Sequence, residues 1–141
     1  ELIGEVARRF GSQCMVLSVE AKRTGPGRWE AYTDNGREHT GLDVVDWVAQ
    51  AVDRGAGEIL LTAVDQEGTR KGLDIELLRA VNARVNVPVI ASGGFSDPAD
   101  LKRASDVGTS GVAIADALHW QRTTLAQIKQ SAREQGLEVR L

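Results

Sequence analysis

The sequence predicts a parallel α/β fold that corresponds to half of a (β/α)8 TIM barrel, with four strand–helix units. Short apolar segments alternate along the chain with helical patterns, and each apolar segment ends in a loop of small or polar residues. The chain has 141 residues, whereas a full barrel takes about 250. An open doubly wound sheet is the alternative architecture that the same alternation permits.

The predicted strands are four short, continuous apolar segments, which is the pattern of strands covered on both faces. They span residues 14–19, 58–62, 87–91 and 111–115. The single cysteine, Cys14, falls in the first of them and is expected to be a buried thiol in a reducing compartment.

The predicted helices follow from apolar residues at helical spacing and from end signals. An amphipathic helix occupies the first ten residues, and further helices span 42–54, 74–85, 98–107 and 123–135. Asp97 is the expected N-cap of the helix that starts at Pro98, and Gly136 ends the last helix.

A long insertion, residues 21–41, separates the first strand from the helix that follows it. It contains Asn35-Gly36 between alternating residues, which is a hairpin signal. Long ordered loops at the carboxyl ends of parallel strands usually serve the active site, so this hairpin is expected near the substrate.

Composition excludes several classes of function. The net charge of −3 argues against a nucleic-acid surface or an anionic membrane surface, and no apolar run approaches the roughly 20 residues of a membrane span. His39 and His119 have no neighbours at metal-ligand spacing, so surface or packing roles are expected for both. The sequence suggests no metal, no organic cofactor and a cytoplasmic location.

Glycines after the third strand suggest a ligand. Parallel α/β proteins bind ligands at the carboxyl ends of their strands, where Ser92-Gly93-Gly94 precedes a helix and Ala115-Asp116 follows the next strand. Loops of this kind can cradle a phosphate on free N–H groups. The alternative is that the glycines only make a tight turn.

Four stretches carry a family resemblance: GSQCMVLSVEAKR, TGLDVVDWVAQAVDRGAGEILLTAVDQEGTRKGLD, VPVIASGGF and the terminal VRL. Together they resemble the carboxyl-terminal half of the cyclase subunit of imidazole glycerol phosphate synthase. The resemblance implies a (β/α)8 barrel of two similar halves, each binding one phosphate of the substrate. It implies an ammonia-dependent cyclase-lyase of histidine biosynthesis, with a glutaminase partner and a phosphorylated aminoimidazole-carboxamide ribonucleotide as substrate.

The resemblance assigns two acidic residues. Glu20 stands where the family has a catalytic aspartate, whose partner aspartate lies on a strand that this chain lacks. Glu20 is therefore a catalytic acid–base group or a structural remnant. Glu58, at the entrance end of the second strand, matches a charge that gates the ammonia passage; the alternative is a solvent-facing strand end.

The remaining implied site residues bind substrate or phosphate: Thr62, Glu67, Gly68, Ser92, Gly93, Gly94, Ala115 and Asp116. Asp116 replaces a serine of the family, and its carboxylate would repel a phosphate. Its alternative role is the N-cap of a short helix at 117–120. Phe95 replaces a smaller residue and is expected to crowd the same corner.

Three functions remain open from the sequence. The first is the cyclase half, and the second is a relative that supplies ammonia for amidination of another substrate, such as a surface-polysaccharide sugar. The third is a non-catalytic half-barrel or scaffold. Residues 1–141 are expected to form a single (β/α)4 domain that belongs to a full barrel and forms a homodimer in isolation, because its inner face and strand edges would otherwise be exposed.

Overall fold

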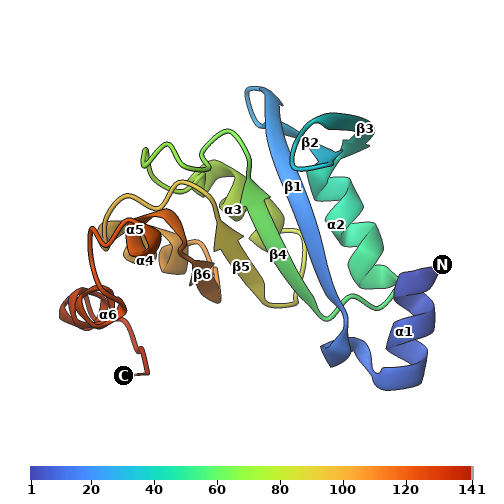
Figure 1. Cartoon of the computed structure of the whole chain (residues 1–141). Coiled ribbons are helices and arrows are strands. Elements are labelled where there is room, and N and C mark those ends of the chain that lie inside the picture. Colours follow the sequence, from blue (N-terminus) through green and yellow to red (C-terminus); the bar gives the residue numbers. More distant parts are fainter. Residues whose placement is uncertain (141) are drawn as a thin grey trace.

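The computed structural model describes residues 1–140, so Leu141 of the terminal motif lies outside the described residues. One six-stranded sheet has the order β3-β2-β1-β4-β5-β6 (Figure 1). Strands β1, β4, β5 and β6 are parallel, and β2 and β3 form an antiparallel extension. The strands span Val16–Gly25, Arg28–Thr33, Glu38–Asp43, Glu58–Ala63, Val89–Ser92 and Gly111–Ala113 in chain order.

The helices follow the predicted order with ends shifted by one to three residues. They are α1 (Leu2–Phe10), α2 (Val44–Asp53), α3 (Ile75–Asn82), α4 (Ala99–Asp106), α5 (Asp116–His119) and α6 (Leu125–Glu134), and a 3-10 turn η1 spans Ser12–Cys14. The prediction that Asp97 caps a helix starting at Pro98 is wrong by one residue, because α4 starts at Ala99 with Pro98 as its N-cap, although Asp97 Oδ1 accepts from the Ala99 N–H at 2.7 Å. A capping box between Thr124 and Gln127 starts α6.

The sheet has one face covered by helices and one open face. Residues that alternate along β1, β4 and β5 pack with α2 and α3 in a single core, and those between them on the same strands are half-buried or exposed. A doubly wound sheet would be covered on both faces, so this arrangement confirms the half-barrel. The expectation that both faces are covered is wrong for residues 1–140, in which helices cover only one face of the sheet.

The first strand is longer than predicted and starts later. It begins at Val16, and its second half from Glu20 to Gly25 exists because it pairs with β2. Cys14 lies in η1, where its thiol contacts the Phe10 carbonyl, and it is exposed. The prediction of a buried strand thiol is therefore wrong, because the chain is still turning at residue 14.

The predicted hairpin at Asn35-Gly36 is confirmed, since β2 and β3 are antiparallel and joined by residues 34–37, and the insertion contains a second turn in addition. Pro26-Gly27 joins β1 to β2, and residues 34–37 join β2 to β3, where Arg37 N–H donates to the Thr33 carbonyl at 3.1 Å. In Figure 1 the β2–β3 hairpin lies beside the carboxyl end of β1, at the same end of the sheet as the loops that follow β4 and β5. The insertion therefore reaches the edge of the sheet where a ligand is expected.

Candidate functional site

A cavity of about 340 Å³ lies at the carboxyl ends of β5 and β6. Seven predicted phosphate-binding residues line it: Glu67, Gly68, Ser92, Gly93, Gly94, Ala115 and Asp116. The other lining residues are Arg70, Phe95, Ala113, Ile114 and Ala117. The loops after three strands thus meet at one hollow, and we call this hollow the cradle.

The two glycines are required by the fold itself. Gly93 and Gly94 have φ of +90° and +93°, a region that side chains disfavour. A Cβ on Gly93 would lie 2.6 Å from the Ala63 carbonyl oxygen, and one on Gly94 would lie 2.3 Å from the Gly72 carbonyl oxygen. Gly72 N–H also donates to the Gly94 carbonyl at 2.8 Å. The close approach is therefore between two loops of the protein, and it shapes the cradle wall.

A buried carboxylate fixes the loop that follows these glycines. Asp100, at the start of α4, is fully buried and accepts from Ser96 N–H at 2.7 Å, Ser96 Oγ at 2.8 Å and Asp97 N–H at 3.3 Å. Burial raises the pKa of Asp100, but hydrogen bonds from Arg103 and Ser96 outweigh burial and hold the pKa below its usual range. Sequence reasoning missed Asp100, although an acid three residues after the expected cap at Asp97 is a signal for it.

Asp116 is not the N-cap of the short helix, and that prediction is wrong. It is the first residue of α5, and its Oδ2 accepts from Arg122 Nη1 at 2.5 Å. The ion pair forms because the chain doubles back after α5. The carboxylate therefore lines the cradle with part of its charge balanced by a neighbouring guanidinium.

Arg70 is the one cation that lines the cradle within residues 1–140, and sequence reasoning missed it. Its side chain is exposed and has no hydrogen bond or ion pair to another described residue. Its φ of +55° places it in a left-handed turn. A basic residue directly after Glu67-Gly68-Thr69 could have signalled an anion site, since a guanidinium binds phosphate through two parallel hydrogen bonds.

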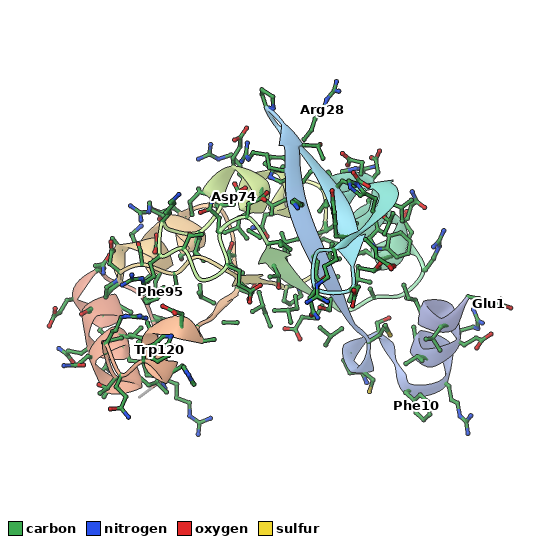
Figure 2. All side chains as sticks on the ribbon, turned by 45° about the horizontal axis from the view of Figure 1, so that its top comes forward. Glu1, Phe10, Arg28, Asp74, Phe95 and Trp120 are labelled. Carbon is green, nitrogen blue, oxygen red and sulfur yellow. The ribbon has the colours of Figure 1, made fainter. Side chains whose placement is uncertain are left out.

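Phe95 also lines the cradle, and its side chain is 7% exposed and belongs to the core. Figure 2 shows Phe95 at the α4–α5 side of the molecule, well away from Arg28 at the tip of the β1–β2 hairpin. The ring forms part of the cradle wall. The expectation that it crowds a phosphate stays a prediction.

A row of polar side chains crosses the open face next to the cradle. Glu20 of β1 is in register with Thr62 of β4, Thr62 with Ser92 of β5, and Ser92 with Ala113 of β6. Residues in register on neighbouring strands point to the same face. The predicted catalytic and substrate-lining residues thus share one line at the carboxyl end of the sheet, and the row ends at the cradle.

Glu20 has a partner in the insertion. Its Oε2 accepts from the backbone N–H of Gly36, in the β2–β3 turn, at 2.8 Å. Glu58, by contrast, begins β4 opposite Val16, at the other end of the sheet. Its side chain has no ion pair within residues 1–140, and its gating role stays a prediction.

The hairpin carries a second polar cluster on the same face as Glu20. Tyr32 Oη lies 2.9 Å from Nδ1 of His39, and the same Nδ1 lies 3.3 Å from the Glu30 carboxylate. Burial raises the pKa of Tyr32, and the hydrogen bond from Gly41 N–H is the main reason that the pKa of Glu30 is lowered. His39 is exposed, in accord with its expected surface position.

On the helix side, a salt-bridge network ties the insertion to α3. Arg23 binds Asp74 at 2.9 Å and Glu76 at 2.7 Å, and Trp29 Nε1 donates to Asp74 at 3.0 Å. Asp74 also caps α3 by accepting from Leu77 N–H. Figure 2 shows Asp74 at the start of α3, to one side of the long β1–β2 strands. The network holds the insertion against the strand ends.

Within residues 1–140, no three His, Cys, Asp or Glu side chains gather closely enough to hold a metal ion. No described helix combines the length and apolar character needed to cross a membrane.

Parallel strands with helices on one face and a glycine-lined cavity at their carboxyl ends define half of a (β/α)8 barrel. The chain belongs to the family described as "Histidine biosynthesis protein", whose model matches residues 1–124. This confirms the family to which the sequence motifs pointed.

Similar proteins share the name imidazole glycerol phosphate synthase subunit HisF. The one from Legionella pneumophila is 69% identical over 94 residues, which are 67% of this chain and 44% of that protein. The one from Gluconacetobacter diazotrophicus is 44% identical over 99% of this chain and 54% of that protein. The one from Dehalococcoides mccartyi is 46% identical over 100% of this chain and 56% of that protein. The chain spans about half the length of these relatives.

Proposed function

We propose that this chain is the carboxyl-terminal half of an imidazole glycerol phosphate synthase cyclase subunit. The observation that carries the proposal is the cradle, in which seven residues assigned by the family resemblance line one cavity at the end of the polar row. The half-barrel would bind one phosphate of the substrate there. The other phosphate would bind to the other half of the barrel.

Glu20 supplies acid–base chemistry in this proposal. Ring closure after attack by ammonia requires protons to be removed from nitrogen and returned to a leaving group, and a carboxylate on each side of the substrate suits both steps. Glu20 would be one carboxylate, with the second on the other half-barrel. Thr62 and Ser92, in register with Glu20, would contact the substrate between its reacting end and the phosphate.

Ammonia would enter from the opposite end of the sheet. Glu58 lies there, one strand length from Thr62 on the same face of β4. A half-buried carboxylate at this position can pair with cations of a complete barrel and so control entry. A glutaminase subunit docked at this end would supply the ammonia, and a cytoplasmic location is part of the same proposal.

Calorimetric titration with inorganic phosphate and with a sugar phosphate tests the cradle. Arg70→Gln removes the one cation that lines the cradle among the described residues, and it should weaken phosphate binding about tenfold, because a charged hydrogen bond contributes about 1.5–3 kcal/mol. Arg28→Gln makes the same charge change at the hairpin tip and should leave binding unchanged. Equal effects of the two variants would contradict a local phosphate site.

The ammonia-dependent amidination of another sugar is the second candidate, and Asp116 favours it. Its carboxylate lines the cradle, where a phosphate meets like charge. If the wild-type chain does not bind phosphate and Asp116→Ser does, the cradle has been adapted to a different substrate. If neither binds, the non-catalytic scaffold is the better description.

The open face implies a second half-barrel. Residues 16–19 of β1 have no strand partner on the side away from β4 within the described residues, and Val16 is 44% exposed on the open face. Exposed strand edges of this kind pair readily with another chain. The isolated chain should form a homodimer, and a monodisperse monomer at high micromolar concentration would rule this out.

A further inference from the structure

We propose that Gly36 is a positioning residue that fixes the Glu20 carboxylate, so that the acid–base group of the site is set by the β2–β3 turn as well as by its own strand. The hydrogen bond from Gly36 N–H to Glu20 Oε2, 2.8 Å long, is the observation behind it. The catalytic meaning of this contact rests on the proposed function. The contact itself does not, and it can be tested separately.

The length of the glutamate side chain is what allows the contact. Glu20 lies on β1 in register with Tyr32, and Gly36 lies beyond the end of β2. An aspartate at position 20 would end about 1.5 Å closer to the backbone. Its oxygen would then lie beyond about 3.5 Å from Gly36 N, which is outside hydrogen-bond range.

The turn that supplies the donor has an unusual backbone. Asp34, Asn35 and Gly36 all have positive φ, at 52°, 55° and 75°. Successive N–H groups in such turns form a concave site for an anion, and backbone conformations of this kind persist where their surroundings fix them. The Glu20 carboxylate is the anion that this turn binds.

A second contact fixes the turn from the other side. Gly36 is buried, and a Cβ at this position would lie 2.5 Å from Cγ1 of Val64, in the loop after β4. The turn therefore packs between the carboxyl ends of β1 and β4. Any side chain at position 36 would push the turn away from Val64 and from Glu20.

Contacts to the loop after β4 and to the start of α3 hold the rest of the insertion in place, so that it can fix the position of the β2–β3 turn. Arg23 and Trp29 both bind Asp74, whose side chain is only 9% exposed, and Arg23 N–H donates to Asp65 at 2.6 Å. Glu20 Oε2 is occupied by Gly36, whereas Oε1 has no hydrogen bond within residues 1–140. The arrangement orients the carboxylate and leaves one oxygen available to a ligand.

Amide hydrogen exchange of the 141-residue chain tests the contact directly. Glu20→Gln keeps the length and an acceptor oxygen and should keep the Gly36 amide protected to within about threefold, whereas Glu20→Asp should lose about tenfold or more in protection. Exchange outside the hairpin should not change in either variant. Equal Gly36 protection in the wild type and Glu20→Asp would overturn the proposal.

Variants of the turn test the consequence for catalysis in the assembled barrel. Gly36→Ala keeps glutamate at position 20 but displaces its carboxylate. It should lower kcat about tenfold or more with little change in KM, since a small displacement of a catalytic group costs up to about a hundredfold in rate. Adding Val64→Ala makes room and should restore part of the loss. Gly41→Ala is the matched control, because Gly41 lies in the same hairpin at φ +72°, donates to Glu30 and has open space around it.

The two proposals fail in different ways. If Gly36→Ala and Gly41→Ala lower kcat equally, the loss comes from general strain in the hairpin and the positioning role is wrong. If exchange shows the contact but neither Glu20→Gln, which removes the acid–base group, nor Gly36→Ala alters ammonia-dependent cyclisation, the catalytic role of Glu20 is overturned.

Discussion

Replacing Asp100 by asparagine should destabilise the chain more than any other change of a single charge on α4. The carboxylate is fully buried and accepts from two groups of Ser96 and from Asp97 N–H, and it pairs with Arg103. Asparagine keeps the shape of the side chain but loses the charge. Its NH2 group can only donate, so it would face N–H and O–H groups whose hydrogen bonds the carboxylate accepted. The loop that carries Ser96 also forms a wall of the cradle.

The magnitude follows from these contacts. Breaking a buried ion pair by removing one partner costs about 3–5 kcal/mol. The Arg103 side chain is 53% exposed and can be rehydrated, so the lower end of that range applies. We expect Asp100→Asn to lower the free energy of unfolding by about 3 kcal/mol at pH 7, which corresponds to a fall in Tm of about 10 °C for a chain of this length.

The pH dependence has a definite sign. The pKa of Asp100 in the folded chain lies below its ordinary value of 3.8, because hydrogen bonds to the charged form outweigh burial. Its contribution is therefore present above about pH 4 and is lost as the pH falls through the folded pKa. The difference in stability between wild type and Asp100→Asn should shrink at low pH.

Urea denaturation at fixed protein concentration, at pH 7 and at pH 3, measures both effects. Asp106→Asn is the matched control, because Asp106 lies on the same helix, is 57% exposed and pairs with Lys102 on the surface. It should cost at most about 0.5 kcal/mol. A loss below about 1 kcal/mol for Asp100→Asn at pH 7, or a loss equal to that of the control, would refute the reasoning.

Four further substitutions have expected outcomes. Asp116→Ser should tighten phosphate binding several-fold, because it removes a negative charge from the cradle. Arg122→Gln should weaken phosphate binding, because it leaves the Asp116 carboxylate without its cation. Calorimetry measures both affinities. Gly94→Ala should cost at least about 2 kcal/mol in unfolding, since φ is +93° and a Cβ would meet a backbone oxygen at 2.3 Å. Glu30→Gln should flatten the acid side of the stability–pH curve. The Gly41 N–H chiefly lowers the pKa of Glu30, so its contribution is present above about pH 4.5 and lost below; an unchanged curve would contradict this.

The sequence was sufficient to predict the parallel strands and the residues that gather at their ends. Apolar periodicity gave the order of elements, and the rule that parallel strands end at the same edge brought Glu67, Ser92 and Asp116 to one cavity. These predictions succeed because they depend on local patterns and on one topological rule. Neither requires knowing which side chains touch.

Contacts between distant segments could not be predicted in the same way. The second half of β1 is a strand only because β2 pairs with it, and although the Asn35-Gly36 signal predicted the β2–β3 hairpin, the turn between β1 and β2 was not predicted. The partners of Glu20 and Asp116, which are Gly36 and Arg122, lie 16 and six residues away and are brought close by turns with positive φ at Asn35 and Gln121. The periodicity of apolar residues does not predict which side chains contact each other across such turns.

The open face explains why the strands looked doubly buried in the sequence. Leu60 of β4 and Ile90 of β5 are in register on this face, between the polar row at Thr62 and the strand entrance at Glu58. Two apolar side chains in the middle of a half-exposed face are costly unless a second layer covers them. If the chain is half of a cyclase barrel, as proposed, this layering, polar at both ends and apolar between, would favour passage of neutral ammonia over ammonium, because a charge is expensive to transfer through an apolar layer. In the proposed full barrel, Leu60 and Ile90 would therefore be covered by the other half and would form the apolar layer of the passage.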